Sequence, residues 1–385
     1  MHYAIVTETY PPEINGVALT VLELELGLRA RGHDIAVVRP RKAREHGAGH
    51  ELLVPSLPLP RYPGLRVGLP ATRRLLGRWR TQRPDAVYVA TEGPLGWSAV
   101  RAARRLGIPV ATGFHTRFDH YARDYGLAFL APLVLDRLRR FHNRTDATVV
   151  PTRELVAQLQ AQGFDRVRRV PRAVDCERFQ PDRRDGALRS GWGLADGGLA
   201  AIHVGRIAPE KNLDLAVRAY RNLQRTLRQL GRPDPRFIWV GDGPSRAALQ
   251  RANPDFTFCG TQRGDALARH FASGDLFLFP SRSETFGNVT LEAMASGVPT
   301  IAFDYGAARE HLRDAQHGAT LALGDESGFI EAATRIAVDD RLRQNMAAAG
   351  REALTCLHPL QVASDFDALL SGLAQRRLDE SLVLA

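Results

Sequence analysis

The segment from Ser283 to Gly297 holds the residues whose types and spacing best fit a chemical role. It follows an apolar run at 276–280 that predicts a buried strand, and it continues into a helical pattern that stops at Gly297. The residues that open this helix are Phe286, Gly287, Asn288 and Val289. The first N–H groups of a helix have no partner inside it, and glycine lets a ligand approach the backbone. The helix start is therefore a candidate anion site.

Two carboxylates flank that candidate anion site. Glu284 precedes the helix, and Glu292 lies one turn inside it, on the face that carries Asn288. A carboxylate repels a phosphate but accepts hydrogen bonds from sugar hydroxyls. The combination predicts a sugar nucleotide as the ligand. The alternative is an ordinary capped helix whose Glu292 faces solvent.

A second set of candidate residues follows another predicted strand, at 199–205. Gly205 and Arg206 end that strand, and Lys211 stands near the start of the next helix. Two cations beside free helix N–H groups would neutralise a diphosphate, whereas the alternative is a surface salt bridge to Glu210. Lys211 is one of only two lysines among 52 basic residues, which favours a specific need for a compact charge there.

Two further candidates lie in the first half of the chain. Gly16 ends the loop at 11–16 before the first predicted helix, where an Asn-Gly turn can bind phosphate oxygens. His115 ends the predicted strand at 109–115 and is expected to face a ligand at the carboxyl edge of the sheet. The alternatives are an ordinary turn and a buried histidine satisfied by its neighbours.

Several catalytic signatures are absent from the sequence. No G-x-G-x-x-G follows the first strand and no G-x-x-x-x-G-K-[ST] occurs, which argues against a dehydrogenase and a P-loop NTPase. No H-E-x-x-H, paired C-x-x-C or G-x-S-x-G occurs, and the histidines lack metal-ligand spacing, so no metal site is expected. The cysteines, Cys176, Cys259 and Cys356, are too scattered for a disulfide framework and suit a reducing compartment.

These candidates require elements that bring strand ends together. Apolar runs typical of strands alternate with helical patterns along both halves of the chain. The predicted strands are 3–8, 34–40, 86–90, 109–115 and 147–151, then 199–205, 236–241, 255–260, 276–280 and 299–303. The helical patterns include 94–106, 127–142, 212–231, 244–252, 264–272 and 287–296. The alternation predicts two doubly wound α/β domains with a boundary near 171–185, while 53–70 reads as an irregular loop.

The charge of the chain is unevenly spread. The 385 residues carry a net charge of +10 and have a globular composition, 44% hydrophobic and 24% charged. Residues 1–185 hold 30 basic and 19 acidic side chains, whereas residues 186–385 hold 22 and 23. This asymmetry predicts an anionic partner for the first half; the alternative is arginine drift in a GC-rich genome. No long apolar run and no secretory signal pattern occurs, so we expect a cytoplasmic protein without a membrane-spanning helix.

Taken together, the motifs resemble those of the retaining glycosyltransferases of family 4, which have the GT-B architecture of two Rossmann-like domains facing across a cleft. The resemblance covers nearly the whole chain. It rests on the loop at Gly16, on 114–116, on Gly205-Arg206 with Lys211, on 241–244, and on Glu284 with Glu292. A narrower similarity, at 114–121, 125–126, 140–144 and 174–175, is to GDP-mannose-dependent α-mannosyltransferases and to enzymes that glycosylate diacylglycerol or make sulfoquinovosyl lipid.

The resemblance implies a role for each candidate residue. Arg206 and Lys211 would bind the donor diphosphate, Glu284 would hold sugar hydroxyls, and Glu292 would bind the ribose. The backbone groups that would face the donor belong to Gly205, Phe286, Gly287, Asn288 and Val289. Gly16 would help to close the diphosphate site, and His115 would lie beside the donor sugar. The family uses a nucleotide sugar as substrate and needs no metal or other cofactor, which leaves Asp242 as a turn residue.

The resemblance also assigns a partner to each domain. Residues 1–172 would bind the acceptor and residues 173–361 the donor, with a C-terminal helix at about 362–385 packing back on the first domain. The window from Arg61 to Arg83 holds seven arginines and no acid, with Leu75, Leu76 and Trp79 between them. A second basic cluster consists of Arg137, Arg139, Arg140 and Arg144. We expect these clusters to bind an anionic lipid surface on the inner face of the cytoplasmic membrane; the alternative is a solvated basic face.

The substrates stay open at this point. GDP-mannose and UDP-glucose both fit as donor, and a lipid or a glycan fits as acceptor. A sugar-nucleotide epimerase or hydrolase of the same fold is the alternative enzyme. A nucleic-acid-binding protein that uses the basic half is a third possibility, but the chain lacks a recognisable reader fold.

Overall fold

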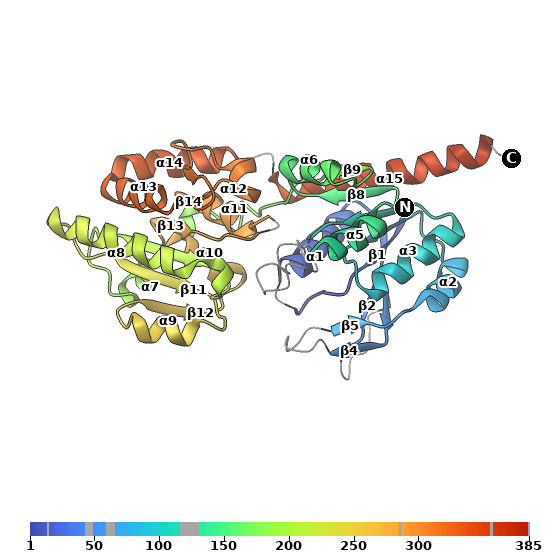
Figure 1. The fold of residues 1–385 in the computed structure, drawn as a ribbon, viewed down its shortest axis with the longest axis horizontal. Coiled ribbons are helices and arrows are strands. Elements are labelled where there is room, and N and C mark those ends of the chain that lie inside the picture. The colour runs from blue at the N-terminus through green and yellow to red at the C-terminus, as the bar shows by residue number, and fades with distance from the viewer. Residues whose placement is uncertain are drawn as a thin grey trace. The chain divides into compact units, whose positions relative to one another are not determined.

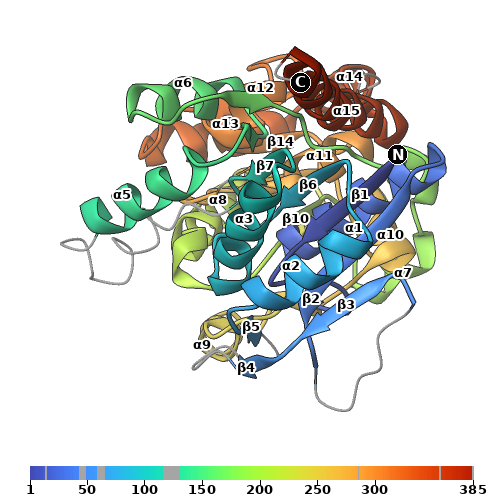
Figure 2. The same ribbon diagram turned by 90° about the vertical axis from the view of Figure 1, so that its right-hand side faces the viewer.

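The computed structural model describes residues 1–13, 15–42, 49–58, 66–115, 131–284, 286–354 and 357–383. The chain divides into two compact units. Unit 1 consists of Met1–Arg172 and Pro359–Ala385, and unit 2 of Ala173–His358. Each unit is a parallel sheet with helices on its faces (Figures 1 and 2).

Unit 1 is built on a seven-stranded sheet with the strand order β3-β2-β1-β6-β7-β8-β9, in which every pair is parallel. The strands are β1 (His2–Val6), β2 (Asp34–Pro40), β3 (Glu51–Val54), β6 (Ala86–Val89), β7 (Val110–Gly113), β8 (Ala147–Val150) and β9 (Val167–Arg169). The central strands are buried apart from His2 at the start of β1, as expected for a sheet covered on both faces. The order reverses between β1 and β6, so their carboxyl ends form the switch point of unit 1.

The helices of unit 1 are α1 (Gly16–Ala30), α2 (Thr72–Thr81), α3 (Pro94–Leu106), α5 (Ala131–His142), α6 (Arg153–Ala161) and α15 (Pro359–Val383). α15 follows unit 2 in sequence but packs against α1 and β6 of unit 1. Asp367 fastens it, because this carboxylate accepts hydrogen bonds from the Tyr3 hydroxyl (3.1 Å) and Arg31 Nε (2.9 Å). His33 Nε2 lies 2.9 Å from the same carboxylate. No helix among the described residues has the length and apolar character needed to cross a membrane.

The segment at 53–70 differs from the irregular loop that its sequence predicts. β3 ends inside it, and β4 (Ser56–Pro58) pairs antiparallel with β5 (Arg66–Gly68), while 59–65 lie outside the described residues. The prediction is wrong for these strands because they are too short to show a period. Their proline is tolerated in a two-stranded ribbon that has open edges.

Unit 2 is built on a six-stranded parallel sheet with the order β12-β11-β10-β13-β14-β15. The strands are β10 (Ala200–Val204), β11 (Arg236–Val240), β12 (Thr257–Gly260), β13 (Leu276–Phe279), β14 (Thr300–Phe303) and β15 (Gly318–Leu321). Its order reverses between β10 and β13, whose carboxyl ends form the switch point of unit 2. Separate apolar clusters cover the two faces of this sheet, which explains the nearly unbroken apolar runs of its strands.

Four of the helices described in unit 2 lie close to the predicted patterns at 212–231, 244–252, 264–272 and 287–296, and the others have no predicted counterpart. The helices of this unit are α7 (Gly186–Gly191), α8 (Leu213–Gln229), α9 (Arg246–Ala252), α10 (Gly264–Ala272), α11 (Asn288–Ala295), α12 (Gly306–His311), α13 (Glu326–Val338) and α14 (Asp340–Glu352). Two short 3₁₀ turns, Pro181–Arg183 and Pro209–Lys211, complete the unit.

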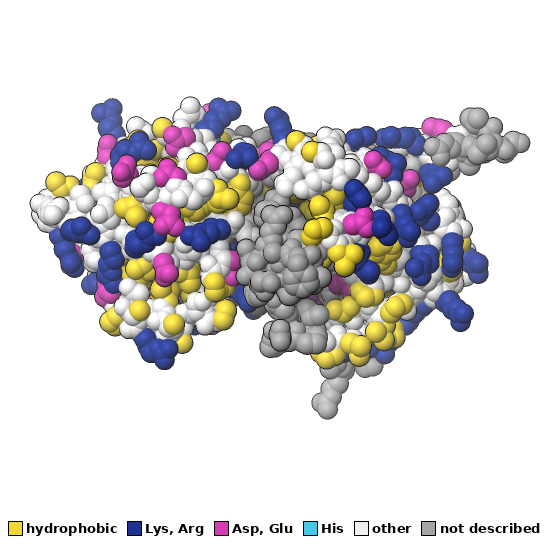
Figure 3. Space-filling model, in the orientation of Figure 1, with side chains coloured by type: hydrophobic (Ala, Val, Ile, Leu, Met, Phe, Trp, Pro, Cys, Tyr) yellow, Lys and Arg dark blue, Asp and Glu magenta, His cyan; other side chains and the backbone are white. Residues whose placement is uncertain are grey.

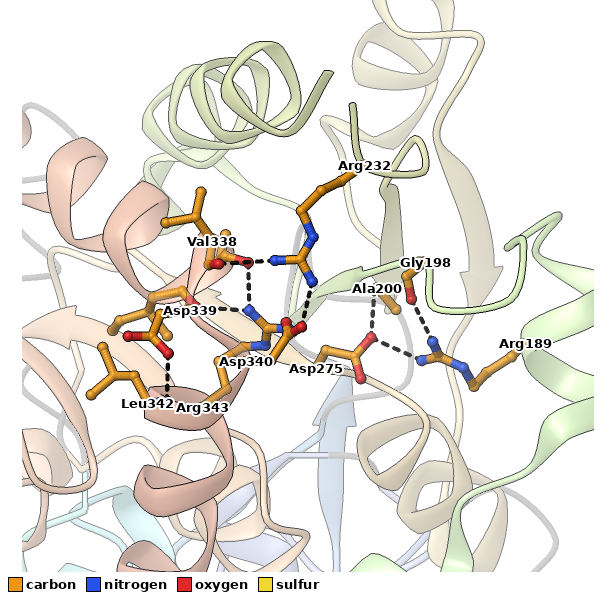
Figure 4. A network of polar contacts seen from close by, with 12 residues as sticks. Arg189, Gly198, Ala200, Arg232, Asp275, Val338, Asp339, Asp340, Leu342 and Arg343 are labelled. Carbon is orange, nitrogen blue, oxygen red and sulfur yellow. Dashed lines mark hydrogen bonds and ion pairs between the residues drawn. The ribbon is translucent and has the colours of Figure 1, made fainter. Parts of the chain in front are cut away.

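Arginine ion pairs hold the side of unit 2 at the amino ends of its strands (Figure 4). Asp275, just before β13, accepts a hydrogen bond from the first backbone amide of β10 (2.7 Å) and pairs with Arg189 (2.9 Å). Asp340 pairs with both Arg232 and Arg343. The basic residues of this unit are thus largely matched by its own acids.

Candidate functional site

The switch point of unit 2 brings the two charged motifs together. The loop after β10 carries Arg206 and Lys211, and the loop after β13 carries Glu284. The backbone amide of Arg282 donates to the carbonyl of Glu210 at 3.2 Å, which ties the two loops to each other. Across this junction the Lys211 ammonium forms an ion pair with the Glu284 carboxylate.

The two cations of the first motif have different surroundings. Arg206 is 45% exposed, and its guanidinium lies 3.7 Å from Glu210, which is the surface salt bridge of the alternative interpretation. The Lys211 side chain is only 14% exposed, and its Nζ lies 5.7 Å from the centre of the Phe279 ring. The Ser281 hydroxyl donates to Glu284 Oε1 at 2.9 Å and so orients the partner of Lys211. The structure thus places Lys211 in a shielded site where a charge interacts strongly.

Glycines let the loops after β10 and β11 pack backbone to backbone. Gly205 has φ +149° and Gly241 has φ +138°, and a Cβ on Gly241 would lie 1.9 Å from the carbonyl oxygen of Gly205. A Cβ on Gly243 would lie 2.4 Å from the carbonyl oxygen of Ile207. A side chain at either position is therefore incompatible with this arrangement, which keeps the backbone accessible at the end of the central strand.

Asp242 has the turn role that its sequence context predicts. Its Oδ1 accepts a hydrogen bond from the amide of Gly243 at 2.8 Å, and its Oδ2 pairs with Arg246 at 3.0 Å. Within the described ranges, no group of three His, Cys, Asp or Glu side chains is placed to hold a metal ion. Cys176 and Cys259 are half-buried free thiols, and Cys356 lies outside the described residues.

α11 begins where the sequence predicts. Gly287 has φ +94° and precedes the first residue, Asn288, while Gly297, with φ +70°, follows the last turn. The amides of Asn288 and Val289 have no hydrogen-bond partner in the part of the chain that the structure describes. The start of α11 therefore offers backbone donors to an anion at the switch point.

The neighbours of that helix start are less open. The Phe286 ring is 5% exposed within the core, and its carbonyl accepts a hydrogen bond from Ala307 at 2.7 Å. Glu292 is half-buried one turn into α11, and Thr285 lies outside the described residues. A small hollow borders this region at the ends of β13 and β14; it is lined by Phe279, Ser281, Glu284, Phe286, Thr290, Ala302, Phe303, Tyr305 and Ala308.

Gly16 is the first residue of α1 and is exposed. The Asn15 side chain caps this helix by accepting a hydrogen bond from the amide of Ala18 at 2.9 Å. No atom lies within 4 Å of a Cβ placed on Gly16, so local packing does not require glycine there. The open space leaves Gly16 accessible to a ligand.

His115 is buried, and both of its ring nitrogens are engaged within unit 1. Arg172 Nη2 lies 2.6 Å from His115 Nδ1, and the Tyr88 hydroxyl lies 2.6 Å from His115 Nε2. Burial, and then the charge of Arg172, hold the pKa of His115 well below its usual value. This geometry matches the alternative interpretation of a histidine satisfied by its neighbours. The rest of the motif, 116–130, lies outside the described residues.

Sequence reasoning missed three residues at the carboxyl edge of unit 1: Glu8, Tyr88 and Arg172. The Glu8 carboxyl accepts hydrogen bonds from the amides of Gly68 (2.5 Å) and Leu95 (3.0 Å), and burial raises its pKa to about 7. The available signal is that Glu8 ends the first predicted strand, where the carboxyl edge of the sheet must lie.

The basic segment of unit 1 differs from its predicted form. Leu75 and Trp79 are buried on the core side of α2, and only Leu76 of the three predicted apolar residues is half-buried rather than buried. α2 and α3 together expose an arginine patch, which we define as Arg73, Arg74, Arg78, Arg80, Arg83, Arg101, Arg104 and Arg105 (Figure 3). Within the described residues, no member of the arginine patch forms an ion pair. Arg61 lies outside the described residues.

The second predicted basic cluster is engaged internally. Arg139 and Arg140 each pair with Asp136 at 2.8 Å. Arg137 and Arg144 stack on the Trp97 ring at 5.6 and 5.3 Å from its centre. The Asp136 carboxylate offsets one of the four positive charges, whereas the contacts with Trp97 fix the positions of Arg137 and Arg144 without neutralising them.

Comparison with known proteins identifies related chains along nearly the whole length. Residues 14–178 match the family model Glycosyltransferase Family 4, and residues 199–339 match Glycosyl transferases group 1. A GDP-mannose-dependent alpha-mannosyltransferase of Mycobacterium tuberculosis is 35% identical over 90% of both chains. A GDP-mannose-dependent alpha-(1-6)-phosphatidylinositol dimannoside mannosyltransferase of the same species is 29% identical over 78% of this chain and 79% of its own.

A solved structure supports the fold. The sucrose-phosphate synthase of Thermosynechococcus elongatus superposes with a TM-score of 0.74 at 17% identity, over 97% of this chain and 98% of that one. The two Rossmann-like units thus form the GT-B fold predicted from the sequence. Together with the 35% identity above, this shows that the chain is a glycosyltransferase and belongs to glycosyltransferase family 4.

Proposed function

We propose that this glycosyltransferase transfers a mannosyl group from GDP-mannose to a hydroxyl of a membrane glycolipid, with retention of the anomeric configuration. The observation that carries the donor is the similarity, over 90% of both chains, to a relative named as GDP-mannose-dependent. The lipid acceptor is supported by the relative whose name includes phosphatidylinositol dimannoside. UDP-glucose, which the sequence also allows, becomes the second donor to test.

The donor diphosphate is assigned to the switch point of unit 2. Lys211 is shielded there, and the amides of Asn288 and Val289 supply further donors. An ammonium has three N–H groups, so Lys211 can keep its bond to Glu284 and still reach a phosphate oxygen. Glu284 then stands beside the phosphate, where it accepts hydrogen bonds from the hydroxyls of the sugar. Arg206 adds a second, more exposed cation.

The remaining candidate residues of unit 2, together with Gly16, keep their predicted roles as part of this proposal. Glu292, one turn into α11, holds the ribose hydroxyls, and Gly205, Phe286 and Gly287 border the phosphate and sugar through their backbone. Gly16 contributes an accessible backbone at the start of α1. We assign acceptor binding to unit 1 and donor binding to unit 2.

Charge development explains how these groups act. Breaking the bond between the anomeric carbon and the phosphate oxygen leaves negative charge on the diphosphate, and fixed cations and N–H groups stabilise that charge. The acceptor hydroxyl attacks from the same face, and its proton passes to the departing phosphate oxygen. Metal-independent transfer is part of the proposal, and an unchanged rate in excess EDTA is the expected result.

The arginine patch is proposed to hold the enzyme at anionic lipid on the inner face of the cytoplasmic membrane. Seven exposed arginines on α2 and α3, together with Arg83 just after α2, give it a high local charge, and none of the eight forms an ion pair among the described residues. Because Leu75 and Trp79 are buried, the proposed contact is mainly electrostatic.

One assay tests the donor and the acceptor together. The purified protein is incubated with a membrane lipid extract and either labelled GDP-mannose or labelled UDP-glucose, and the products are identified by mass spectrometry. Mannosylated lipid from GDP-mannose alone is expected. Free mannose formed equally with and without lipid would identify a hydrolase, and an altered nucleotide sugar would identify an epimerase. Glucosylated lipid formed from UDP-glucose would show that UDP-glucose, and not GDP-mannose, is the donor.

A further inference from the structure

A chain of contacts runs through the buried edge of unit 1. The Phe366 ring of α15 packs edge-on against Tyr88 of β6, with 4.9 Å between ring centres. The Tyr88 hydroxyl meets His115 Nε2, and His115 Nδ1 meets Arg172, the last residue of unit 1 before the chain enters unit 2. A Cβ on Gly113 would lie 2.3 Å from both the His115 ring and the Tyr88 hydroxyl, so the backbone itself leaves room for this contact.

The chemistry of Arg172 fixes the position of the proton on His115. A guanidinium only donates hydrogen bonds, so the nitrogen that faces it, His115 Nδ1, must be the unprotonated acceptor. A neutral imidazole then carries its proton on Nε2 and donates it to the Tyr88 oxygen. Both ring nitrogens are thereby occupied, and neither is left to take a proton from an acceptor substrate.

We infer that Arg172 is a positioning residue that holds His115 as the neutral tautomer protonated on Nε2, so that His115 takes no part in proton transfer. The ring acts by its fixed position at the end of β7. The acceptor's proton must then leave by another route, which agrees with its transfer to the departing phosphate. Only the activity measurements below rest on the proposed function.

The groups around His115 oppose its protonation. Tyr88 and Arg172 contact the ring, and His142 of α5 acts on it through its charge. Glu23 acts through its charge on Arg172, and Glu92 acts through its charge on Tyr88. Burial is the largest cause, and Arg172 is the largest of the charged neighbours.

Ring nitrogen chemical shifts of ¹⁵N-histidine-labelled protein test the inference without any substrate, and a His115→Gln variant assigns the signals. In the wild type, Nδ1 should be unprotonated and Nε2 protonated from pH 5.5 to 8.5. In Arg172→Met, the shifts should move towards the average of the two neutral tautomers, and protonation should begin at a higher pH. Arg172→Lys should restore the wild-type pattern, because an ammonium also only donates. Arg168→Met, which removes an exposed charge from β9, is the matched control and should change nothing.

The activity profile gives a second measurement. The acid limb of kcat/KM against pH should shift upward in Arg172→Met and stay in place in Arg172→Lys and Arg168→Met. A wild-type His115 that carries its proton on Nδ1, or that titrates near its ordinary pKa, would overturn the inference. Correct ring shifts in a protein that transfers no sugar would instead reject the proposed function alone.

A variant that leaves Arg172 intact covers the case in which Arg172→Met does not fold. Tyr88→Phe removes the acceptor of the Nε2 proton and keeps the donor to Nδ1. His115 Nδ1 should remain unprotonated in this variant, with a change confined to the Nε2 shift. Protonation of Nδ1 in Tyr88→Phe would show that Arg172 does not set the tautomer.

Discussion

The central strands of the two sheets end in the same hydrogen bond but in different residues. In unit 1 the amide of Thr7, which follows β1, donates to the carbonyl of Val38 at 3.0 Å. In unit 2 the amide of Gly205, which follows β10, donates to the carbonyl of Val240 at 3.0 Å. The two positions are equivalent in their sheets, and only the second is a glycine.

The next residue of the neighbouring strand repeats the contrast. In unit 1 it is Arg39, a buried side chain that pairs with Glu51 at 2.8 Å. In unit 2 it is Gly241, whose missing side chain lets the backbone approach Gly205. Unit 1 fills its carboxyl edge with its own side chains, whereas unit 2 leaves backbone exposed at the same place.

The helix starts at the two switch points differ in whether their first backbone amides have a hydrogen-bond partner. In unit 1 the Glu8 carboxyl takes the amide of Leu95 at the start of α3. In unit 2 the amides of Asn288 and Val289 have no partner among the described residues. A helix start that is already satisfied has nothing to offer a phosphate, which is the physical reason for assigning the donor to unit 2.

The largest expected effect comes from giving unit 2 a side chain at its glycine edge. Gly241→Ala should lower the free energy of unfolding by about 4 kcal/mol, because its Cβ meets the carbonyl of Gly205 and its φ excludes a side chain. Urea denaturation measures the loss, and sugar transfer should fall with it. A variant with wild-type stability would show that the close approach is dispensable.

Glu8→Gln examines the filled edge of unit 1 through the pH dependence of stability. Native Glu8 keeps its proton up to about pH 7, whereas the unfolded chain releases it near pH 4.5. The contribution of the protonated Glu8 carboxyl to the free energy of unfolding is therefore complete below about pH 4.5 and is lost as the pH rises through 7. Relative to Glu8→Gln, the wild type should lose about 3 kcal/mol of unfolding free energy between pH 4.5 and 8. Parallel stability curves for the two proteins would contradict the burial of Glu8.

Lys211→Ala removes the shielded cation of unit 2. We expect kcat for sugar transfer to fall more than roughly tenfold, since a charge-assisted contact contributes about 1.5–3 kcal/mol. Arg228→Ala is the control, because Arg228 forms an exposed ion pair with Asp234 on the last turn of α8. Turnover in Lys211→Ala equal to that of the control would refute the role of Lys211.

The arginine patch tests a second difference, between exposed arginines of unit 1 that form no ion pair among the described residues and an ion-paired arginine of unit 2. Arg78→Gln should weaken binding to anionic vesicles by about 1 kcal/mol, and each further patch substitution should add a similar loss. Arg228→Gln, which removes a paired arginine from unit 2, should leave binding unchanged. Flotation with neutral and anionic vesicles measures both, and equal flotation with the two lipids would reject an electrostatic contact.

The smallest effect is expected at Gly77, inside α2. No atom lies within 4 Å of a Cβ at this position, so Gly77→Ala should raise the free energy of unfolding by about 0.5–1 kcal/mol through helix propensity. Thermal unfolding of Gly77→Ala and the wild type measures this gain in stability. A loss of stability would mean that glycine at 77 has a role that its surroundings do not show, and that the contrast with Gly241 is overstated.

The sequence predicts several elements closely and misses others, including the 13-residue helices α13 and α14. The helices at 94–106 and 264–272 match α3 and α10 at both ends, because periodicity and a terminal glycine or proline coincide there. β4, β5 and β9 have only three residues each, which is too few to show a period. β15 is also missed, although it has four residues, like several strands that the sequence does predict.

Contacts between distant residues account for what sequence reasoning missed in the site. Lys211 and Glu284 can be recognised as candidates, but their ion pair joins residues 73 positions apart across the reversal of strand order. Arg172 reaches His115 over 57 positions, and nothing local marks it. Counting charges between Arg61 and Arg83 likewise cannot show that Leu75 and Trp79 face the core.

Because α15 returns to unit 1, the two units cannot complete their folding in the order in which they are synthesised. Unit 2 is one continuous segment of the chain, so it can fold as soon as residue 358 has left the ribosome. Unit 1 is the first to be synthesised but the last to complete its fold, because the partner of Arg31, Asp367, is synthesised 336 residues later. Until α15 is synthesised, the face of α1 and β6 that it covers remains exposed to solvent. During that time the nascent chain consists of a fully synthesised unit 2 and an incompletely packed unit 1.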